Sequence, residues 1–140
     1  MAVLTVQTEV AERLTARPGT RAYGSLSVIM AAGFDARALF KIRPGSFSPP
    51  PEILSTVIRL RPVAPAMTGP ENFERFKFFV RGCFRHKRKT LANSMQAGLK
   101  LPKNVSEALI EKIGRLSNVR AEQLSFGDYV KLHELWQNQR

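Results

Sequence analysis

Three consecutive prolines constrain the fold of this chain more than any other local feature. Pro49, Pro50 and Pro51 follow Phe47 and Ser48 in the sequence. Each proline ring fixes its own φ at about −65° and disfavours a helical conformation in the residue before it. The segment is therefore extended, stiff and poor in backbone donors, and it holds the Phe47 ring in a fixed place.

Strand-like sequences flank this stiff segment on both sides. Residues 38–43 and 53–61 have the composition of β-strands. The connection between them has no helical pattern and is too short for a parallel crossover. The sequence therefore predicts an antiparallel hairpin joined by the proline segment.

Phe47 has two possible roles at this stage. Aromatic residues usually pack into a core, so its ring could plug a local core beside the proline turn. The alternative is a functional aromatic that the rigid backbone holds in place. The residue types leave both roles open.

The remaining elements follow from hydrophobic periodicity and turn residues. Residues 2–7 form the expected first strand, and the uncharged, proline-rich segment 62–70 marks a boundary. Beyond that boundary the pattern is helical. The expected helices cover residues 9–15, 25–34 with Ser25 as the cap, 71–97 as one helix or two in series, 105–113 with Asn104 or Ser106 as the cap, and 125–136.

Charge narrows the class of partner. The 140 residues include 22 Lys and Arg against 11 Asp and Glu, which gives a formal net charge of +11. An apolar content of 44% is enough for a hydrophobic core. This excess of positive charge predicts a polyanionic partner.

The basic residues concentrate in one stretch between Arg75 and Lys89, which contains no acidic residue. On a continuous helix, one stripe beside the apolar face would carry Lys77, Arg81, Arg85 and Arg88. A solvated helix surface is the alternative, but such surfaces usually interleave both signs, whereas like charges at this spacing repel one another. A phosphate backbone would relieve the repulsion. The predicted nucleic-acid contacts are Lys77, Arg81, Arg85, Lys87, Arg88 and Lys89.

Other classes of function find little support in the sequence. The single Cys83 excludes an internal disulfide, and it has no zinc-ligand neighbours at the usual spacing. His86 belongs to the basic stretch, and His133 is expected on a helix surface. The sequence shows no nucleophile with a base, no paired carboxylates and no glycine-rich loop after a strand. Residue chemistry alone therefore favours a binding module without a metal over an enzyme.

Membrane segments are not indicated either. The apolar N-terminal residues lack the basic region of a signal peptide, and no window is long and apolar enough to cross a bilayer. A single cysteine fits a reducing compartment. We therefore expect a cytoplasmic protein without membrane contact.

Five motifs, in order over nearly the whole chain, resemble the bacterial ribosomal RNA small-subunit adenine N6,N6-dimethyltransferases. These motifs are Gln7-x-Glu9-Val10-Ala11-Glu12-Arg13, Tyr23-Gly24-x-Leu26-Ser27-Val28, Pro44-x-x-Phe47-x-Pro49-Pro50-Pro51-x-x-x-Ser55, Arg88-Lys89-Thr90-Leu91 and Arg120-Ala121-Glu122-x-Leu124-Ser125. The match covers only the second half of such an enzyme. The half with the S-adenosylmethionine loop and the Asn-[Leu/Ile]-Pro-Tyr motif is expected to precede Met1.

The resemblance implies an α/β fold in two parts. Residues 1–66 would supply the last strands and the antiparallel hairpin of a Rossmann-like methyltransferase sheet, and residues 67–140 a small helical domain that binds ribosomal RNA. The first strand would normally have parallel neighbours on both sides. We therefore expect its exposed edge to favour self-association.

The resemblance also implies a function. The complete enzyme would use S-adenosylmethionine to dimethylate two adjacent adenosines of small-subunit ribosomal RNA during ribosome biogenesis, with Phe47 stacked on the target adenine. Its partners would be that RNA and the small ribosomal subunit. This chain alone is expected to bind no S-adenosylmethionine and to be inactive. The alternative is a non-catalytic remnant that binds RNA or assists ribosome assembly.

Overall fold

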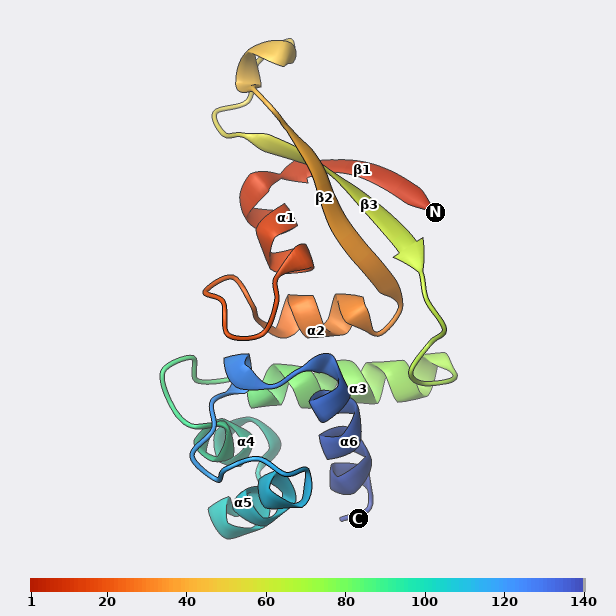
Figure 1. Cartoon of the computed structure of the whole chain (residues 1–140). Helices are drawn as coiled ribbons and strands as arrows, with labels where there is room; N and C mark the ends of the chain where they lie inside the picture. Colours follow the sequence, from red (N-terminus) through yellow and green to blue (C-terminus); the bar gives the residue numbers. More distant parts are fainter. Residues whose placement is uncertain (140) are drawn as a thin grey trace.

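The computed structural model describes residues 1–139 and combines a small sheet with a group of helices (Figure 1). The sheet contains β1 (Ala2–Gln7), β2 (Phe34–Ile42) and β3 (Ser55–Pro62), in the order β1-β3-β2. Both neighbours of β3 are antiparallel to it. The predicted β2–β3 hairpin is therefore confirmed. The expectation that the first strand lies between parallel neighbours is wrong, because β1 pairs with β3 in the antiparallel direction.

Two short helices lie between β1 and β2. Helix α1 (Thr8–Thr15) covers one face of the sheet, where Ala11 packs with Ile58 and Leu60 in a small core. Helix α2 (Ser25–Ala31) lies beneath the sheet, next to the helical part (Figure 1). The helix predicted to run through residue 34 ends at Ala31. The chain then turns at Ala32 and Gly33, and β2 begins at Phe34. Gly24 occupies the N-cap position that was predicted for Ser25.

The rest of the chain is helical. It contains α3 (Pro70–Cys83), α4 (Leu91–Leu99), α5 (Lys103–Lys112) and α6 (Phe126–Gln137), with single turns of 3-10 helix at η1 (Pro44–Ser46) and η2 (Ala121–Gln123). Helix α5 begins earlier than predicted, with Pro102 in the N-cap position in place of Asn104 or Ser106. Ser125 caps α6, and its hydroxyl accepts a hydrogen bond from the Asp128 amide at 3.1 Å.

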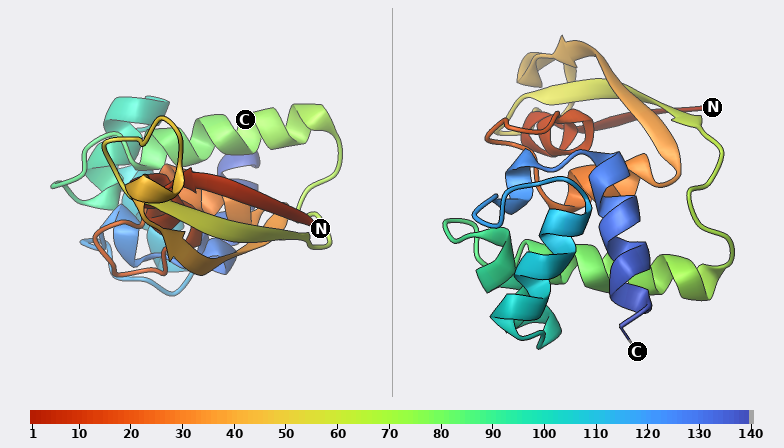
Figure 2. Two further views of the ribbon diagram at one scale, coloured as in Figure 1. Left: turned by 90° about the horizontal axis from the view of Figure 1, so that it is seen from above. Right: turned by 60° about the horizontal axis from the view of Figure 1, so that its bottom comes forward.

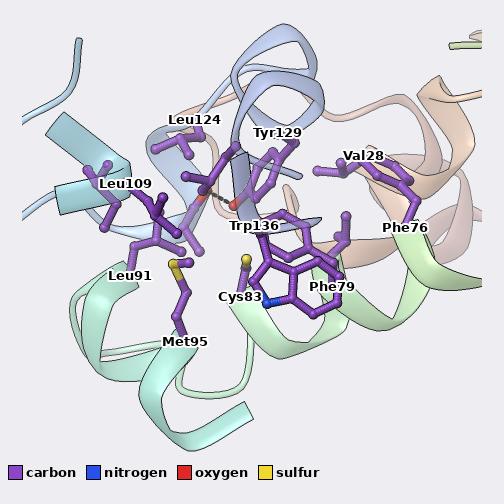
Figure 3. Packing of buried hydrophobic residues seen from close by; sticks show 14 of the residues in the cluster. Val28, Phe76, Phe79, Cys83, Leu91, Met95, Leu109, Leu124, Tyr129 and Trp136 are labelled. Atoms are coloured by element: carbon purple, nitrogen blue, oxygen red, sulfur yellow. Dashed lines mark hydrogen bonds between the residues drawn. The ribbon is translucent and has the colours of Figure 1, made fainter. Parts of the chain in front are cut away.

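The main hydrophobic core joins α2 to the helical part. Val28 of α2 lies beside Phe76 of α3 and Tyr129 of α6, in the same cluster as buried side chains of α4 and α5 (Figure 3). Tyr23, just before α2, belongs to the same cluster, and its hydroxyl donates a hydrogen bond to the Leu124 carbonyl at 2.7 Å. The division into residues 1–66 and 67–140 stays a prediction, and the core packing crosses it.

Helices α3 and α4 approach each other closely at a pair of glycines. A Cβ atom on Gly98 would lie 2.6 Å from the Cα atom of Gly82. Position 98 therefore needs a residue without a side chain.

His133 corrects another prediction, because it lies in the core and not on a helix surface. Its side chain is 4% exposed and contacts the rings of Phe76, Phe79 and Trp136 at centroid distances of 5.3, 5.3 and 5.8 Å. Burial and the nearby Arg75 charge lower the pKa of His133 to about 4. The imidazole is therefore neutral at pH 7.

No helix within residues 1–139 is long and apolar enough to cross a membrane.

Candidate nucleic-acid interface

Most of the predicted basic residues lie in a loop and not on a helix. Helix α3 ends at Cys83, and Arg85 to Lys89 form turns that lead to α4. The predicted single stripe from Lys77 to Arg88 is therefore wrong. The physical reason lies in the same charge run, since consecutive like charges without acidic partners disfavour continuation of a helix.

The ends of this loop, residues 84–90, are fixed by hydrogen bonds. The Thr90 hydroxyl caps α4 by accepting from the Asn93 amide at 3.3 Å. The buried Ser94 hydroxyl accepts from the His86 amide and donates to the His86 carbonyl, both at 3.2 Å. The Leu91 amide donates to the Val119 carbonyl at 2.8 Å. The basic side chains of the loop are therefore displayed from a well-held backbone.

Lys77 differs from the other predicted contacts. Lys77 pairs with Glu74, lies 5.0 Å from the centroid of the Phe73 ring and is half-buried. Its charge is therefore already partnered. The other predicted contacts are exposed and form no ion pair within residues 1–139: Arg81, Arg85, Lys87, Arg88 and Lys89.

Three loops far apart in the sequence enclose a cleft of about 1070 Å³. Lys87 and Arg88 line it from the α3–α4 loop, Arg21 from the α1–α2 loop and Arg120 from the segment before η2. The Gly19 amide donates to the Glu122 carbonyl at 2.7 Å and ties the α1–α2 loop to η2. The cleft thus adds two cations to the predicted set.

Arg21 and Arg120 were missed because neither lies in a basic run. The available signal was the family resemblance, since Arg120 begins one of the quoted motifs and Arg21 comes two residues before another. Only folding brings them to Lys87 and Arg88.

Phe47 lies at the tip of the β2–β3 hairpin, immediately after η1. Its amide donates to the Pro44 carbonyl at 3.2 Å, and the Ser46 amide donates to the Arg43 carbonyl at 3.0 Å. The side chain is partly exposed and belongs to neither hydrophobic cluster of the described residues. The core-plug role therefore has no packing to support it.

The hairpin tip and the basic loop are not neighbours. The tip projects from the far end of the sheet, whereas the α3–α4 loop lies beside α2 and η2 (Figure 1, Figure 2). Phe47 is also absent from the lining of the cleft. The structure therefore brings the basic residues together with Arg21 and Arg120, but it leaves Phe47 apart from them.

The described residues do not fit a site for S-adenosylmethionine. Strand β1 ends at Gln7 and α1 begins at Thr8, which leaves no glycine-rich loop between the strand and the helix. The large cleft has an excess of cations, which disfavours a positively charged sulfonium. Among residues 1–139, no group of His, Cys, Asp and Glu could hold a metal ion.

Comparison with known proteins identifies the family. The family described as ribosomal RNA adenine dimethylase matches residues 1–138. This chain belongs to that family. The family resemblance predicted from the sequence is thus confirmed.

Curated relatives named ribosomal RNA small subunit methyltransferase A are similar to nearly the whole chain. The relative from Acidobacterium capsulatum is 42% identical over 124 residues, which are 89% of this chain and 44% of the relative. The relative from Levilactobacillus brevis is 36% identical over 140 residues, which are 98% of this chain and 47% of the relative. The chain therefore spans about half the length of the curated relatives it matches.

Two solved structures share the fold. A dimethyladenosine transferase from Plasmodium falciparum superimposes with a TM-score of 0.81 and 25% identity, over 99% of this chain and 57% of the other. The 23S rRNA methyltransferase ErmE superimposes with a TM-score of 0.64 and 25% identity, over 95% and 53%. The predicted fold class, the end of a Rossmann-like methyltransferase sheet followed by helices, is confirmed.

Proposed function

We propose that this chain supplies the RNA-contacting part of an S-adenosylmethionine-dependent dimethyltransferase. That enzyme would methylate the N6 amines of two adjacent adenosines in small-subunit ribosomal RNA during assembly of the small subunit. The identity of 36–42% with relatives named small subunit methyltransferase A is the observation that supports it most directly.

The residues of this chain would contribute by positioning the RNA. The exposed cations of the α3–α4 loop would neutralise backbone phosphates and release their counterions. Phe47 would stack on the extruded adenine, since a flipped base needs a flat apolar surface held by a rigid backbone. S-adenosylmethionine supplies the methyl groups in such a reaction, and we assign no residue of this chain to its site.

Salt dependence of RNA binding tests the phosphate contacts. The 140-residue chain is titrated into a labelled hairpin of small-subunit ribosomal RNA, by fluorescence anisotropy, at salt concentrations from about 50 to about 300 mM. Affinity should fall steeply with salt. Each of the variants Arg85→Gln, Arg88→Gln and Lys89→Gln should lower the slope by about one unit.

Lys112→Gln is the matched control. Lys112 is exposed in the last turn of α5, outside the basic loop. Its replacement should leave the slope unchanged. A flat salt response in the unmodified chain would rule out the phosphate contacts.

The alternative is a non-catalytic protein that binds RNA or assists ribosome assembly. Calorimetry with S-adenosylmethionine should give no heat with this chain alone, because its described residues do not fit the donor. Addition of the donor-binding half of a relative separates the two functions. Formation of N6,N6-dimethyladenosine, measured by mass spectrometry, would support the enzyme part, and RNA binding without methylation would support the alternative.

A further inference from the structure

The cleft between the three loops has an aromatic floor that the proposed function does not use. Phe84 and Tyr23 both line the cleft. The Phe84 ring is partly exposed and stacks on Tyr129, with a centroid distance of 5.6 Å and an interplanar angle of 27°. Tyr23 contacts Phe84 edge-on at 6.2 Å and 65°. A stack of aromatic rings therefore ends at the cleft.

Hydrogen bonds hold this floor in place. The Tyr129 hydroxyl donates to the Ala121 carbonyl at 2.6 Å, and the Tyr23 hydroxyl donates to the Leu124 carbonyl at 2.7 Å. Burial raises the pKa of Tyr23 to about 12, so its hydroxyl stays protonated at neutral pH. A preorganised aromatic surface loses little conformational entropy when a planar group binds to it.

Basic side chains outnumber acidic ones in the lining of the cleft. Arg13 lines the cleft but is already paired with Glu9 at 2.7 Å. Four other lining cations form no ion pair with any residue from 1 to 139: Arg21, Lys87, Arg88 and Arg120. Among the described residues, two further carboxylates line the cleft, those of Glu12 and Glu122. The cleft therefore attracts anions and leaves its cations free to bind them.

An aromatic surface beside unpaired cations matches the chemistry of a single-stranded nucleic acid. Any base can stack on an aromatic ring, and the flanking phosphates bind the cations. A base inside a duplex cannot reach such a ring without being extruded. A volume of about 1070 Å³ is at the upper end for small-molecule sites and has room for a nucleotide with its flanking phosphates.

We propose that this cleft binds an unpaired nucleotide of RNA whose base stacks on Phe84. Its flanking phosphates contact Arg21, Arg88 and Arg120. The site is distinct from the hairpin tip, where Phe47 would meet the target adenine. It rests on the proposed function only in taking RNA as the ligand.

Binding of single strands compared with duplexes tests the cleft. Anisotropy is measured with a labelled oligonucleotide of about ten nucleotides, alone and paired with its complement. Phe84→Leu keeps an apolar side chain against Tyr129 but removes the flat ring. Affinity for the single strand should fall about tenfold, and affinity for the duplex should stay within about twofold.

A charge variant provides a second test. Arg21→Gln combined with Arg120→Gln should lower the salt slope for the single strand by about 1.4 units, which corresponds to two phosphate contacts. Arg61→Gln is the matched control, because Arg61 is exposed at the end of β3 and does not line the cleft. It should leave the slope unchanged.

The outcomes separate this inference from the proposed function. A folded Phe84→Leu variant that binds the single strand as tightly as the native chain would overturn the cleft site. If that variant does not fold, an unchanged slope in the double arginine variant overturns it. Absence of all RNA binding by the native chain would reject the proposed function and the cleft site together. Binding that depends on Lys89 but on neither Phe84 nor Arg120 would reject the cleft alone.

Discussion

Phe47 is outside both hydrophobic clusters, so its ring can be removed at little cost to folding. We predict that Phe47→Ala changes the thermal midpoint of this chain by less than about 2 °C. Phe79→Ala is the control and should lower the midpoint strongly, since Phe79 is fully buried. In a complete relative, loss of the corresponding ring should slow methyl transfer about 10–100-fold. Unchanged turnover would exclude base stacking by this residue.

His133 predicts a pH dependence of stability. Its pKa is about 4 in the folded chain and about 6.5 when unfolded. Between these values the unfolded state binds a proton that the folded state does not, so the free energy of unfolding falls as the pH is lowered. We expect a loss of roughly 1–3 kcal/mol from pH 7 to pH 4.

Urea unfolding of His133→Leu at pH 7 and pH 4 tests whether His133 causes this pH dependence. The free energy of unfolding of the variant should change much less between the two pH values than that of the native chain. His86→Gln is the control. Because His86 is exposed in the basic loop, this variant should show the same pH dependence of stability as the native chain. A His133→Leu variant with the native slope would assign the pH dependence to other groups.

Some residue roles could be predicted from the sequence and others could not. Proline geometry predicted the position of the segment around Phe47 but not its path, because η1 precedes it and residues 47–49 form bends in place of an extended run. The prediction for His133 was wrong because the helical pattern around a histidine does not show whether its ring is exposed or packed among aromatic rings. Arg21 and Arg120 join the cleft through contacts between distant loops, which no local pattern encodes.

Among the elements, the crossing of α3 and α4 depends on glycine. We predict that Gly98→Ala destabilises the chain by about 1–3 kcal/mol, because the new Cβ would lie 2.6 Å from Gly82. Gly127→Ala in α6 is the matched control. A Cβ there would lie 3.8 Å from the Ser125 hydroxyl oxygen, so helix propensity should make it stabilising by about 0.5–1 kcal/mol. Chemical denaturation of both variants measures the contrast, and effects of the same sign would contradict it.

Element types were predicted better than element ends. Hydrophobic period distinguishes strands from helices within one segment, which is why β1, the β2–β3 hairpin and α6 were expected. Helix ends depend on tertiary contacts. Helix α3 ends at Cys83, and the following turn is held where the His86 backbone bonds to Ser94 and the Leu91 amide bonds to the Val119 carbonyl. The hydrophobic period alone continued through that turn.

For the whole molecule, the outer edge of β1 is unpaired within the described residues. Val3 is 55% exposed and Leu4 is 45% exposed, and the strand has no charged residue to protect the edge. We predict that the chain self-associates through β1. Association should increase with salt, because salt screens repulsion between chains of net charge +11, whereas RNA binding should weaken.

Sedimentation equilibrium over a range of salt concentrations measures this association. Val3→Lys should reduce it, since a lysine disfavours pairing at a strand edge. Val63→Lys, at another exposed apolar residue beyond β3, is the control and should leave it unchanged. Equal association in all three proteins would exclude the β1 edge.

The shared core of α2 and the helical part has a practical consequence for anyone who wishes to express the helices by themselves. A gene cut at residue 67 would discard Tyr23, Val28 and Ala32 and leave a hole beside Phe76 and Phe84. Such a fragment should precipitate or melt early, whatever its affinity for RNA. A shorter protein should therefore keep this shared core whole, and the proline-rich segment 62–70 is a poor place to cut.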